Sequence, residues 1–465
     1  MAKVSVIIPV LNGAEYIREC MDSIVGQTLS DIEIIPVDAG STDGTLEILR
    51  EYAKKDARIK LLTADKKSMG YQYNIGIAAA EGEYVGFCES DDYISETMYE
   101  KLARIAEKED LDYIRSDFDM FIDKDERIFL NYHVLAGNRK VLYGKRFKPI
   151  DYPDILYRDV NMWNGIYKRE FIQRNAIKLN ETPGAAFQDT GFVIQTFLAA
   201  KRAMYVQEDA NKYRRDNIGS SVYNLKGVVN VVQEAEYSEE YLSRLRVTDW
   251  NSRAVIFQRF CSLFFGFYGK LPEKGQFTED VGRAVDRFKK LAESVYSKLP
   301  YYAESFEGIG HSLSLNTLFR DLDAFDSLRK QIEEVERNCR HRFYRHIVGY
   351  PRAVIFGAGE VGASLYALLR KNDYEGVTCF ADNDAEKWGK RLMGREIVAP
   401  DRLDDLNDGK TVFIIAMTSH IEMVREQLIA MNVDRENICK AVVLIPHNAM
   451  EADIHDTAME GEEPK

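Results

Sequence analysis

The most constraining feature of the sequence is the alternation of β-rich and helical segments near its start. Residues 3–11 (KVSVIIPVL), 31–40 (DIEIIPVDAG) and 83–89 (EYVGFCE) are rich in Val, Ile and aromatic residues. The intervening segments 14–29 and 41–56 place apolar residues at helical spacing, and polar capping residues open the second of them. This alternation predicts an α/β fold with a mostly parallel sheet that helices cover on both faces.

Composition narrows the class of protein. The net charge of −13 argues against nonspecific nucleic-acid binding, so we expect no nucleic-acid partner. The N-terminus lacks the basic and apolar zones of a signal peptide, and we find no apolar run near 18 residues that could span a membrane. The six cysteines are scattered without a C-x-x-C pair, which indicates reduced thiols in a cytoplasmic protein.

Changes in pattern along the chain predict four parts. Residues 1–225 form the first α/β domain, and residues 226–345 consist of long helical segments with little β-rich alternation. Residues 346–447 restart a strand, glycine turn, helix and strand, which predicts a small Rossmann-like domain. Residues 448–465 are acidic without periodicity and predict a disordered tail.

Distinctive residues follow three of the predicted strands, at the edge where open α/β sheets bind ligands. They are Pro9 and Asn12, then Asp38, then the acidic cluster of Glu89, Asp91 and Asp92. Carboxylates here could hold Mg²⁺ or Mn²⁺ against a diphosphate, and Asp38 could accept the N–H of a uracil ring. Alternatively, Asp38 starts a turn, while Asp92 or Ser95 caps a helix beginning near Glu96. Three such strand ends in one sheet favour a binding site.

The segments VSVIIPVLNGAEYIRECMDSIVGQTLSDIEIIPVDAGSTDGT (4–45) and NIGIAAAEGEYVGFCESDD (74–92) resemble the nucleotide-binding half of a family 2 glycosyltransferase. The resemblance covers about the first 225 residues and implies the GT-A fold, a UDP-sugar donor and a divalent metal, Mn²⁺ or Mg²⁺. It implies that Asp38 recognises the uracil, that Asn74 contacts the nucleotide-sugar and that residues 89–92 form the metal-binding D-x-D region.

Three residues depart from the family pattern. Ala39 stands where many members have a second Asp, and Tyr73 replaces an Arg that often precedes the Asn matching Asn74. Glu89 replaces the first Asp of the D-x-D region, so Asp91 and Asp92 are the stronger metal candidates.

The segment 180–202 carries the candidate catalytic base. A transferase that inverts the sugar carbon needs a base for the acceptor hydroxyl, and Asp or Glu usually supplies it. Asp189 follows a glycine-containing loop and starts a predicted helix, where a helix N-cap is the alternative role. The resemblance matches Asp189 to the family's catalytic Asp, with Gln188 in place of the more common preceding acid.

Two further segments supply candidate ligand contacts. YRRDNIGSS (213–221) offers Arg214, Arg215 and Ser220 to a diphosphate leaving group, although a solvated charged loop is the alternative. Trp163 in MWNGIYKREFI (162–172) could stack on an acceptor sugar, and a core Trp is the alternative.

Together these features predict a metal-dependent, inverting hexosyltransferase of bacterial surface-polysaccharide biosynthesis. We expect it to move a sugar from a UDP-sugar to a hydroxyl of a glycan or lipid-linked acceptor. The segments 260–269 (FCSLFFGFYG) and 337–346 (RNCRHRFYRH) could contact the inner face of the plasma membrane, although a packed helical core and a linker helix are the preferred interpretations. A homo-oligomer is also compatible with the sequence.

The C-terminal segment defines the main alternative function. Gly357, Gly359 and Gly362 have G-x-G-x-x-G spacing after a strand, and Asp382 follows about 20 residues later, as in dinucleotide-binding folds. An NAD-dependent oxidoreductase or a bifunctional enzyme is therefore the alternative. NAD is not favoured, because the segment shows no catalytic set beyond a lone His420. It also resembles small Rossmann-like domains on sugar-modifying enzymes. A noncatalytic carbohydrate-binding module is a third hypothesis, although it would not need Asp189 beside a metal site.

Overall fold

The computed structural model describes residues 2–123, 127–133, 142–157, 161–217, 227–247, 250–268, 278–296, 342–417 and 421–441. The chain divides into two compact units, one of residues 1–118 and 134–325 and one of residues 119–133 and 326–465. We describe each unit by itself. The predicted tail, residues 448–465, lies outside the described residues.

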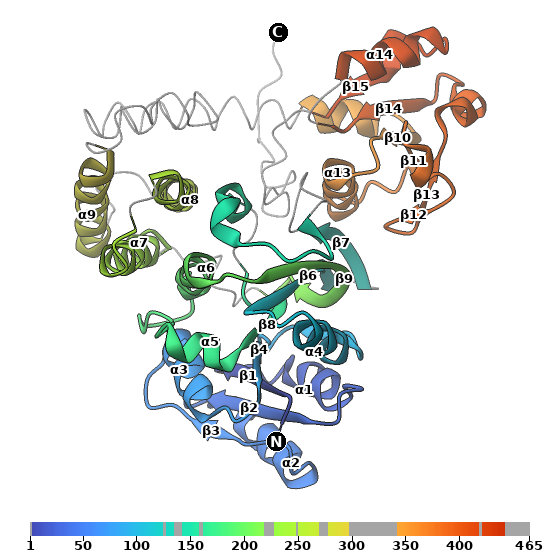
Figure 1. The fold of residues 1–465 in the computed structure, drawn as a ribbon. Coiled ribbons are helices and arrows are strands. Elements are labelled where there is room, and N and C mark those ends of the chain that lie inside the picture. The colour runs from blue at the N-terminus through green and yellow to red at the C-terminus, as the bar shows by residue number, and fades with distance from the viewer. Residues whose placement is uncertain are drawn as a thin grey trace. The chain divides into compact units, whose positions relative to one another are not determined.

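The first unit contains most of a mixed β-sheet, whose residues 119–123 and 127–133 are counted in the second unit (Figure 1). In the described part of the chain the strand order is β3-β2-β1-β4-β8-β6-β9-β5, and β7 pairs with β6. The strands are β1 (Val4–Val10), β2 (Ile32–Asp38), β3 (Leu62–Thr63), β4 (Tyr84–Phe87), β5 (Tyr93–Ile94), β6 (Tyr113–Asp123), β7 (Arg127–His133), β8 (Gly165–Lys168) and β9 (Ala203–Arg214). The four strands β3, β2, β1 and β4 run parallel, whereas β8 is antiparallel to β4 and β6. The predicted α/β fold is confirmed, but the sheet is mixed rather than mostly parallel, because the strands beyond β4 include the antiparallel pairs β4–β8, β6–β8 and β5–β9.

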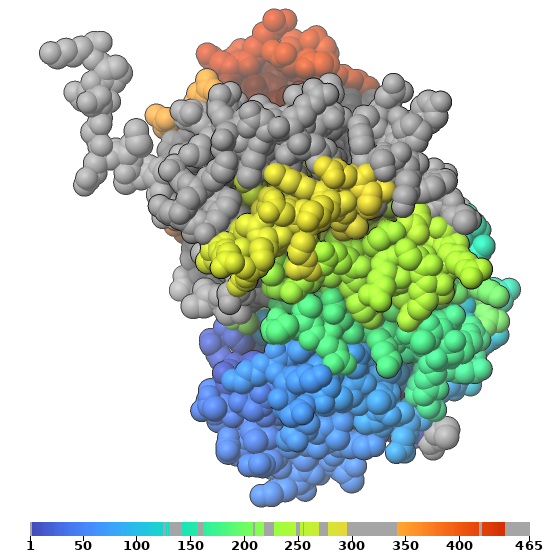
Figure 2. Space-filling model, turned by 90° about the vertical axis from the view of Figure 1, so that its left-hand side faces the viewer, coloured from blue at the N-terminus to red at the C-terminus, as the bar shows by residue number. Residues whose placement is uncertain are grey.

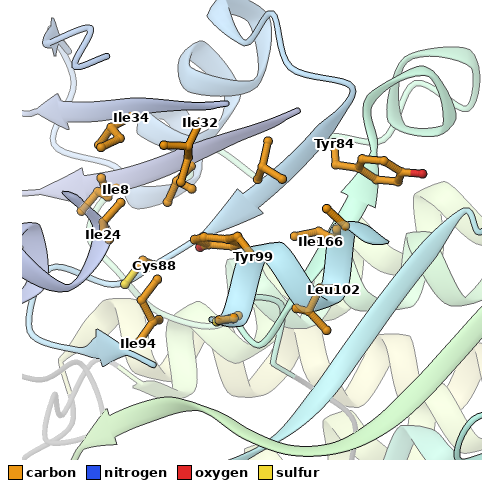
Figure 3. Close-up of a cluster of buried hydrophobic side chains, with 14 of the residues drawn as sticks. Ile8, Ile24, Ile32, Ile34, Tyr84, Cys88, Ile94, Tyr99, Leu102 and Ile166 are labelled. Carbon is orange, nitrogen blue, oxygen red and sulfur yellow. The ribbon is translucent and has the colours of Figure 1, made fainter. Parts of the chain in front are cut away.

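Helices cover the sheet of the first unit because its strands bury side chains on both faces. The helices are α1 (Ile17–Val25), α2 (Thr45–Lys55), α3 (Met69–Ala79), α4 (Met98–Lys108), α5 (Arg169–Arg174) and α6 (Gln188–Ala199), with short 3-10 helices η2 (Pro149–Asp151) and η3 (Pro153–Tyr157). Figure 3 shows side chains of α1, α4 and the strands meeting in one apolar cluster, among them Ile8, Ile24 and Tyr99. The preceding residue of β1, Ile7, points to the opposite face, where it packs against Gly76 of α3. This period of two is typical of a strand buried on both faces.

The helix after the acidic cluster begins later than expected. We predicted a start near Glu96 with Ser95 or Asp92 as its cap, but α4 begins at Met98 and its N-cap residue is Thr97, whose side chain makes no capping hydrogen bond. Ser95 instead pairs through its backbone N–H with Ala210 O and accepts hydrogen bonds through its carbonyl oxygen. The cap prediction is therefore wrong.

The predicted helical middle region is confirmed in its described part. It contains α7 (Gly227–Arg244), α8 (Trp250–Tyr268) and α9 (Glu279–Tyr296). Phe264 of α8 stacks on Phe288 of α9 with ring centroids 4.0 Å apart, and both side chains are fully buried. The described part of the aromatic segment, residues 260–268, therefore contributes to a packed helical core. Figure 2 shows the helical region, in yellow-green and yellow, lying on the green residues that include α6, which α7 contacts.

A second, smaller sheet forms the C-terminal part of the chain. Its order is β12-β13-β11-β10-β14-β15, and all neighbours except β12 and β13 pair in parallel. The elements are β10 (Arg352–Phe356), α13 (Glu360–Lys371), β11 (Val377–Ala381), η5 (Ala385–Lys387), β12 (Arg391–Leu392), β13 (Arg395–Val398), η6 (Pro400–Leu406), β14 (Thr411–Ile415), α14 (Ile421–Ala430), η7 (Arg435–Asn437) and β15 (Ile438–Lys440). Ile355 packs in one apolar cluster with α13, and Phe356 packs in another with α14. Helices therefore cover both faces, as Figure 1 shows.

Candidate active site

A cavity opens at the edge of the first sheet where the parallel strands end. The register pairs Val10 of β1 with Asp38 of β2, and Ile7 with Phe87 of β4, so the carboxyl ends of these strands reach the same edge. The cavity has a volume of about 720 Å³. Among the predicted site residues, its described lining includes Pro9, Asn12, Glu89, Asp91, Trp163 and Asp189. Residues far apart in the sequence therefore meet here as expected.

The acidic cluster divides between the cavity and the protein interior. Glu89 and Asp91 line the cavity, and Asp91 Oδ2 accepts a hydrogen bond from Asn217 Nδ2 at 2.8 Å. Asp92 is buried instead, and its Oδ1 accepts from the Arg214 backbone N–H at 2.9 Å. This arrangement differs from the expected ranking, since Glu89 rather than Asp92 stands beside Asp91 at the cavity.

Burial and the crowding of like charges raise the pKa values of two carboxyl groups in this cluster. Burial raises the pKa of Glu89 well above its usual range, and the negative charges of Asp91 and Asp189 raise it further. Burial and the neighbouring carboxylates also raise the pKa of Asp92. The second oxygen of Asp92 is buried without a hydrogen-bond partner. Carboxyl groups held this close repel one another unless they bind protons or a cation.

Arg214 holds the acidic cluster in place from inside the protein. Its side chain is buried, its Nε donates to the backbone oxygen of Asp91 at 3.0 Å, and its guanidinium pairs with Glu19 of α1 at 2.8 Å and with Asp216 at 3.3 Å. It also lies over the Tyr16 ring. These contacts account for the guanidinium within the protein, and the diphosphate contact of Arg214 stays a prediction that they do not favour.

Asp189 lies in the first turn of α6 and faces the cavity. Its Oδ1 accepts the backbone N–H of Thr190 at 2.8 Å. The N-cap position belongs to Phe187, so Asp189 is inside the helix and its carboxylate benefits from the helix N-terminus. Burial raises the pKa of Asp189 to about 6, although the Thr190 N–H and the guanidinium groups of Arg259 and Arg115 oppose that rise.

Aromatic side chains form one wall of the cavity. Trp163 stacks on Tyr213 with ring centroids 5.1 Å apart and meets the edge of Phe118 at 4.6 Å. Trp163 is almost fully buried and also lines the cavity, so it belongs both to the core and to the lining, the two places that the sequence left open for it. Arg215 places its guanidinium 5.5 Å from the Tyr213 ring centre. Ser220 lies outside the described residues.

Two other predicted nucleotide contacts have local partners outside the described lining of the cavity. Asp38 is buried and accepts the backbone N–H groups of Gly40 and Ser41, which is the turn alternative considered above. Asn74 exchanges two hydrogen bonds with the backbone of Leu179, at 2.9 and 3.0 Å, and so holds the chain before the Asp189 loop. Their nucleotide roles stay predictions.

Sequence reasoning missed three residues that support the site. Gln72 of α3 lines the cavity and donates from Nε2 to Val10 O at 2.9 Å and to Val37 O at 2.6 Å, so it ties α3 to the ends of β1 and β2. Glu234 of α7 and Arg259 of α8 act electrostatically on the environment of Asp189. A polar residue on the apolar face of a helix was the available signal for Glu234.

The predicted second nucleotide site keeps part of the dinucleotide pattern. Gly357 has φ +118, which requires glycine, and Gly362 packs against Gly357 O where a Cβ would clash. Gly359 faces open space. Asp382, however, accepts from the Ala358 N–H at 2.8 Å and from Lys387 Nζ at 2.9 Å, so its carboxylate already has partners. NAD binding at this loop stays a prediction that these contacts do not favour.

The described residues contain no group of three or more His, Cys, Asp or Glu side chains arranged to hold a metal ion by themselves. Among the described helices, none combines the length and apolar character needed to cross a membrane.

Comparison with known proteins identifies the family. Residues 5–175 match the family described as glycosyl transferase family 2. The uncharacterized glycosyltransferase YibD of Escherichia coli is 30% identical over 236 residues, which cover 50% of this chain and 68% of YibD. The chain belongs to glycosyl transferase family 2.

Another family 2 relative extends this picture. The uncharacterized glycosyltransferase EpsJ of Bacillus subtilis is 33% identical over 213 residues, 46% of this chain. The match spans 61% of the length of EpsJ, so it covers only part of that relative.

Solved structures support the fold of this family 2 member. The crystal structure of residues 1–349 of TarS from S. aureus in complex with UDP-GlcNAc superposes with a TM-score of 0.57 and 17% identity, covering 71% of this chain and 92% of that one. At this identity the likeness shows the fold alone, and it confirms the expected GT-A type. Residues 349–439 match a different family, described as C2185-like, N-terminal. The match therefore does not confirm the added Rossmann-like domain that the sequence resembled, although the second sheet itself is present.

Proposed function

We propose that this chain is a metal-dependent, inverting glycosyltransferase that moves a sugar from a UDP-sugar to a hydroxyl of a glycan or lipid-linked acceptor. We place it in surface-polysaccharide biosynthesis at the inner face of the plasma membrane. The observation that carries the proposal is one cavity lined by Glu89, Asp91 and Asp189 at the carboxyl edge of the sheet. TarS, which shares the fold, was crystallised with UDP-GlcNAc, and this supports a UDP-sugar as the donor.

The residues at the cavity suit a divalent metal that binds together with the donor. Mg²⁺ is usually held by one or two carboxylates plus substrate phosphates, so a cage of three protein ligands is not required. Glu89 and Asp91 supply oxygen donors on the cavity wall, and their mutual repulsion would fall on binding a cation. When bound, the metal would neutralise charge on the diphosphate leaving group.

Each step of the proposed reaction is assigned to a residue in or beside the cavity. Asp189, ionised, takes the proton from the acceptor hydroxyl, and that oxygen attacks the anomeric carbon as the bond to UDP breaks, which inverts the stereochemistry. The Thr190 N–H holds the Asp189 carboxylate in one orientation. Arg214 is held by ion pairs inside the protein, whereas the Arg215 guanidinium lies over the Tyr213 ring. We therefore assign the diphosphate contact to Arg215. The stacked Trp163 and Tyr213 exclude water on one side of the cavity and offer an apolar surface to a sugar.

The activity should fall at acidic pH because the base must be ionised. The pKa of Asp189 is raised to about 6, so its ionised fraction is nearly complete above that value and drops about tenfold per pH unit below it. We therefore expect kcat/KM to be level near neutral pH, to fall about five- to sixfold between pH 6 and pH 5, and to approach a tenfold loss per pH unit below that. The Arg259 charge lowers the pKa of Asp189, so Arg259→Met should move this acid limb to higher pH. A rate that stays constant from pH 5 to pH 8 would contradict Asp189 as the base.

A ligand screen tests the proposed function as a whole. The unfolding temperature of the full chain is measured with UDP-glucose, UDP-galactose and UDP-N-acetylglucosamine, each with Mn²⁺ and with a chelator. A ligand that binds the native state raises the free energy of unfolding. At a ligand concentration of 100 times its Kd we expect an increase of about 2.7 kcal/mol with Mn²⁺, seen as a higher unfolding temperature, and a much smaller increase with the chelator. GDP-mannose with Mn²⁺ is the control for nucleotide choice. Equal stabilisation with and without metal would remove the metal from the proposal, and no stabilisation by any UDP-sugar would overturn the donor class.

A further inference from the structure

We propose that Glu234, supplied by α7 of the helical region, is a positioning residue that fixes the first turn of α6 and thereby the placement of Asp189. The inference rests on the proposed function, because it assigns a role within the same site. It starts from three contacts that Glu234 and its neighbours make around the N-terminal end of α6.

The first contact is steric and involves Gly191. A Cβ on Gly191 would lie 1.9 Å from Glu234 Oε1 and 3.1 Å from its Cδ, so the carboxyl lies directly on the helix backbone. A residue with a side chain could stand at this position only if the Glu234 carboxyl or one of the two helices moved. Gly191 lies two residues after Asp189, and the close approach of α7 to α6 is therefore made at the turn that carries the base.

The second observation is that α6 begins without an ordinary cap. Phe187 occupies the N-cap position with φ +66, and its side chain makes no capping hydrogen bond. The Thr190 N–H is bound by Phe187 O and by Asp189 Oδ1, and Glu234 Oε1 lies against Gly191, buried without a hydrogen-bond partner. The first backbone N–H groups of a helix need acceptors from outside the helix. The Glu234 carboxyl is a polar group from another helix that lies beside this uncapped turn.

The third contact extends to the loop before α6. Asn180 Nδ2 donates to Glu234 Oε2 at 3.1 Å, so one carboxyl contacts both the loop and the helix that follows it. Phe267 of α8 packs on Phe187 with ring centroids 5.0 Å apart. The helical region therefore contacts the chain on both sides of Asp189, through an aromatic contact at Phe187 and a polar contact between Glu234 and Asn180.

The charge state of Glu234 determines which substitution preserves this contact. The titratable groups that face it are Asp189 from α6 and Tyr237 from its own helix. Burial raises the pKa of Glu234 to about 8, and the Asp189 charge contributes to the rise. Near pH 7 the side chain is therefore mainly neutral, and Gln matches both its shape and its charge. Ala removes the acceptor of the Asn180 hydrogen bond and leaves a space beside Gly191.

The experiment compares Glu234→Ala and Glu234→Gln in the full chain, with Glu240→Gln as a matched control, because Glu240 is an exposed carboxyl on the same helix. The first readout is the titration of the Asp189 carboxyl by ¹³C NMR, with its signal assigned by its loss in Asp189→Asn. We expect a midpoint about one pH unit lower in Glu234→Ala, because water would enter beside the carboxyl, and an unchanged midpoint in the other two variants. An unchanged midpoint in Glu234→Ala would overturn the inference.

The second readout is kinetic and uses the UDP-sugar that is turned over fastest. We expect Glu234→Ala to lower kcat on the order of 100-fold, because a misplacement of about 1 Å can cost that much, with the affinity for UDP and Mn²⁺ unchanged. Glu234→Gln should recover most of the rate. A parallel loss of UDP affinity and kcat would mean general damage and would also overturn the inference. If the wild-type chain turns over no UDP-sugar, the proposed function fails while the NMR titration still decides the role of Glu234.

Discussion

Replacing Asp189 with Asn should abolish sugar transfer while leaving the binding of UDP and Mn²⁺ intact. The amide keeps an oxygen that can accept the Thr190 N–H, so the first turn of α6 should persist. It cannot accept the acceptor proton, and loss of a general base costs on the order of 100- to 10,000-fold in rate. Initial rates of transfer and isothermal titration with UDP and Mn²⁺ measure the two parts separately.

The control for this variant is Asp434→Asn, which removes an exposed carboxylate in the second unit. It should leave both rate and affinity unchanged. An Asp189→Asn protein that transfers sugar at a rate within about tenfold of wild type would show that another group is the base.

Replacing Asp91 with Asn should remove most of the metal dependence of UDP binding. Asp91 lines the cavity beside Glu89, and even outer-shell partners of a metal cost on the order of 10- to 100-fold in metal affinity when they are lost. We expect at least that loss in the affinity for UDP measured with Mn²⁺, and little change measured with a chelator.

Asp92→Asn is the matched control, since the two residues are neighbours with the same side chain. Its Oδ1 accepts the Arg214 N–H, and its other oxygen is buried without a hydrogen-bond partner. An amide NH₂ buried there costs about 1–3 kcal/mol of stability, so the unfolding temperature should fall while the metal dependence remains. If Asp92→Asn loses the metal dependence and Asp91→Asn keeps it, the assignment of the metal ligands is reversed.

The sequence allowed the sheet and the meeting of the strand ends to be predicted, because both follow from local patterns. Val4, Val6 and Ile8 alternate with residues for the other face, and parallel strands bring their carboxyl ends to one edge. The second sheet and the helical region followed from the same periodicities. The start of α4 could not be predicted in this way. Ser95 is a residue type that often caps helices, but its backbone N–H pairs with Ala210 O, and the helix begins three residues later, at Met98.

The direction of each polar side chain could not be predicted, because it depends on partners distant in the sequence. Arg214 and Arg215 are adjacent and chemically identical, yet the first is bound by Glu19 and Asp216 and the second lies over Tyr213. Asp91 and Asp92 are also adjacent and chemically identical, yet Asp91 lines the cavity and Asp92 is buried. Glu234 was missed because a single acid in a long helix is ordinarily solvated, and its place on the apolar face of α7 was not weighed; the packing against Gly191 shows what it contacts.

The two apolar clusters of the C-terminal sheet have a consequence for calorimetry. The residues of both clusters lie between positions 343 and 441, and α13 and α14 each close one face of the sheet. Heating the protein should therefore produce more than one transition, and a single melting temperature would average unrelated events. A UDP-sugar bound at the first sheet would shift one transition only, so a calorimeter that resolves both also shows which part of the chain holds the ligand.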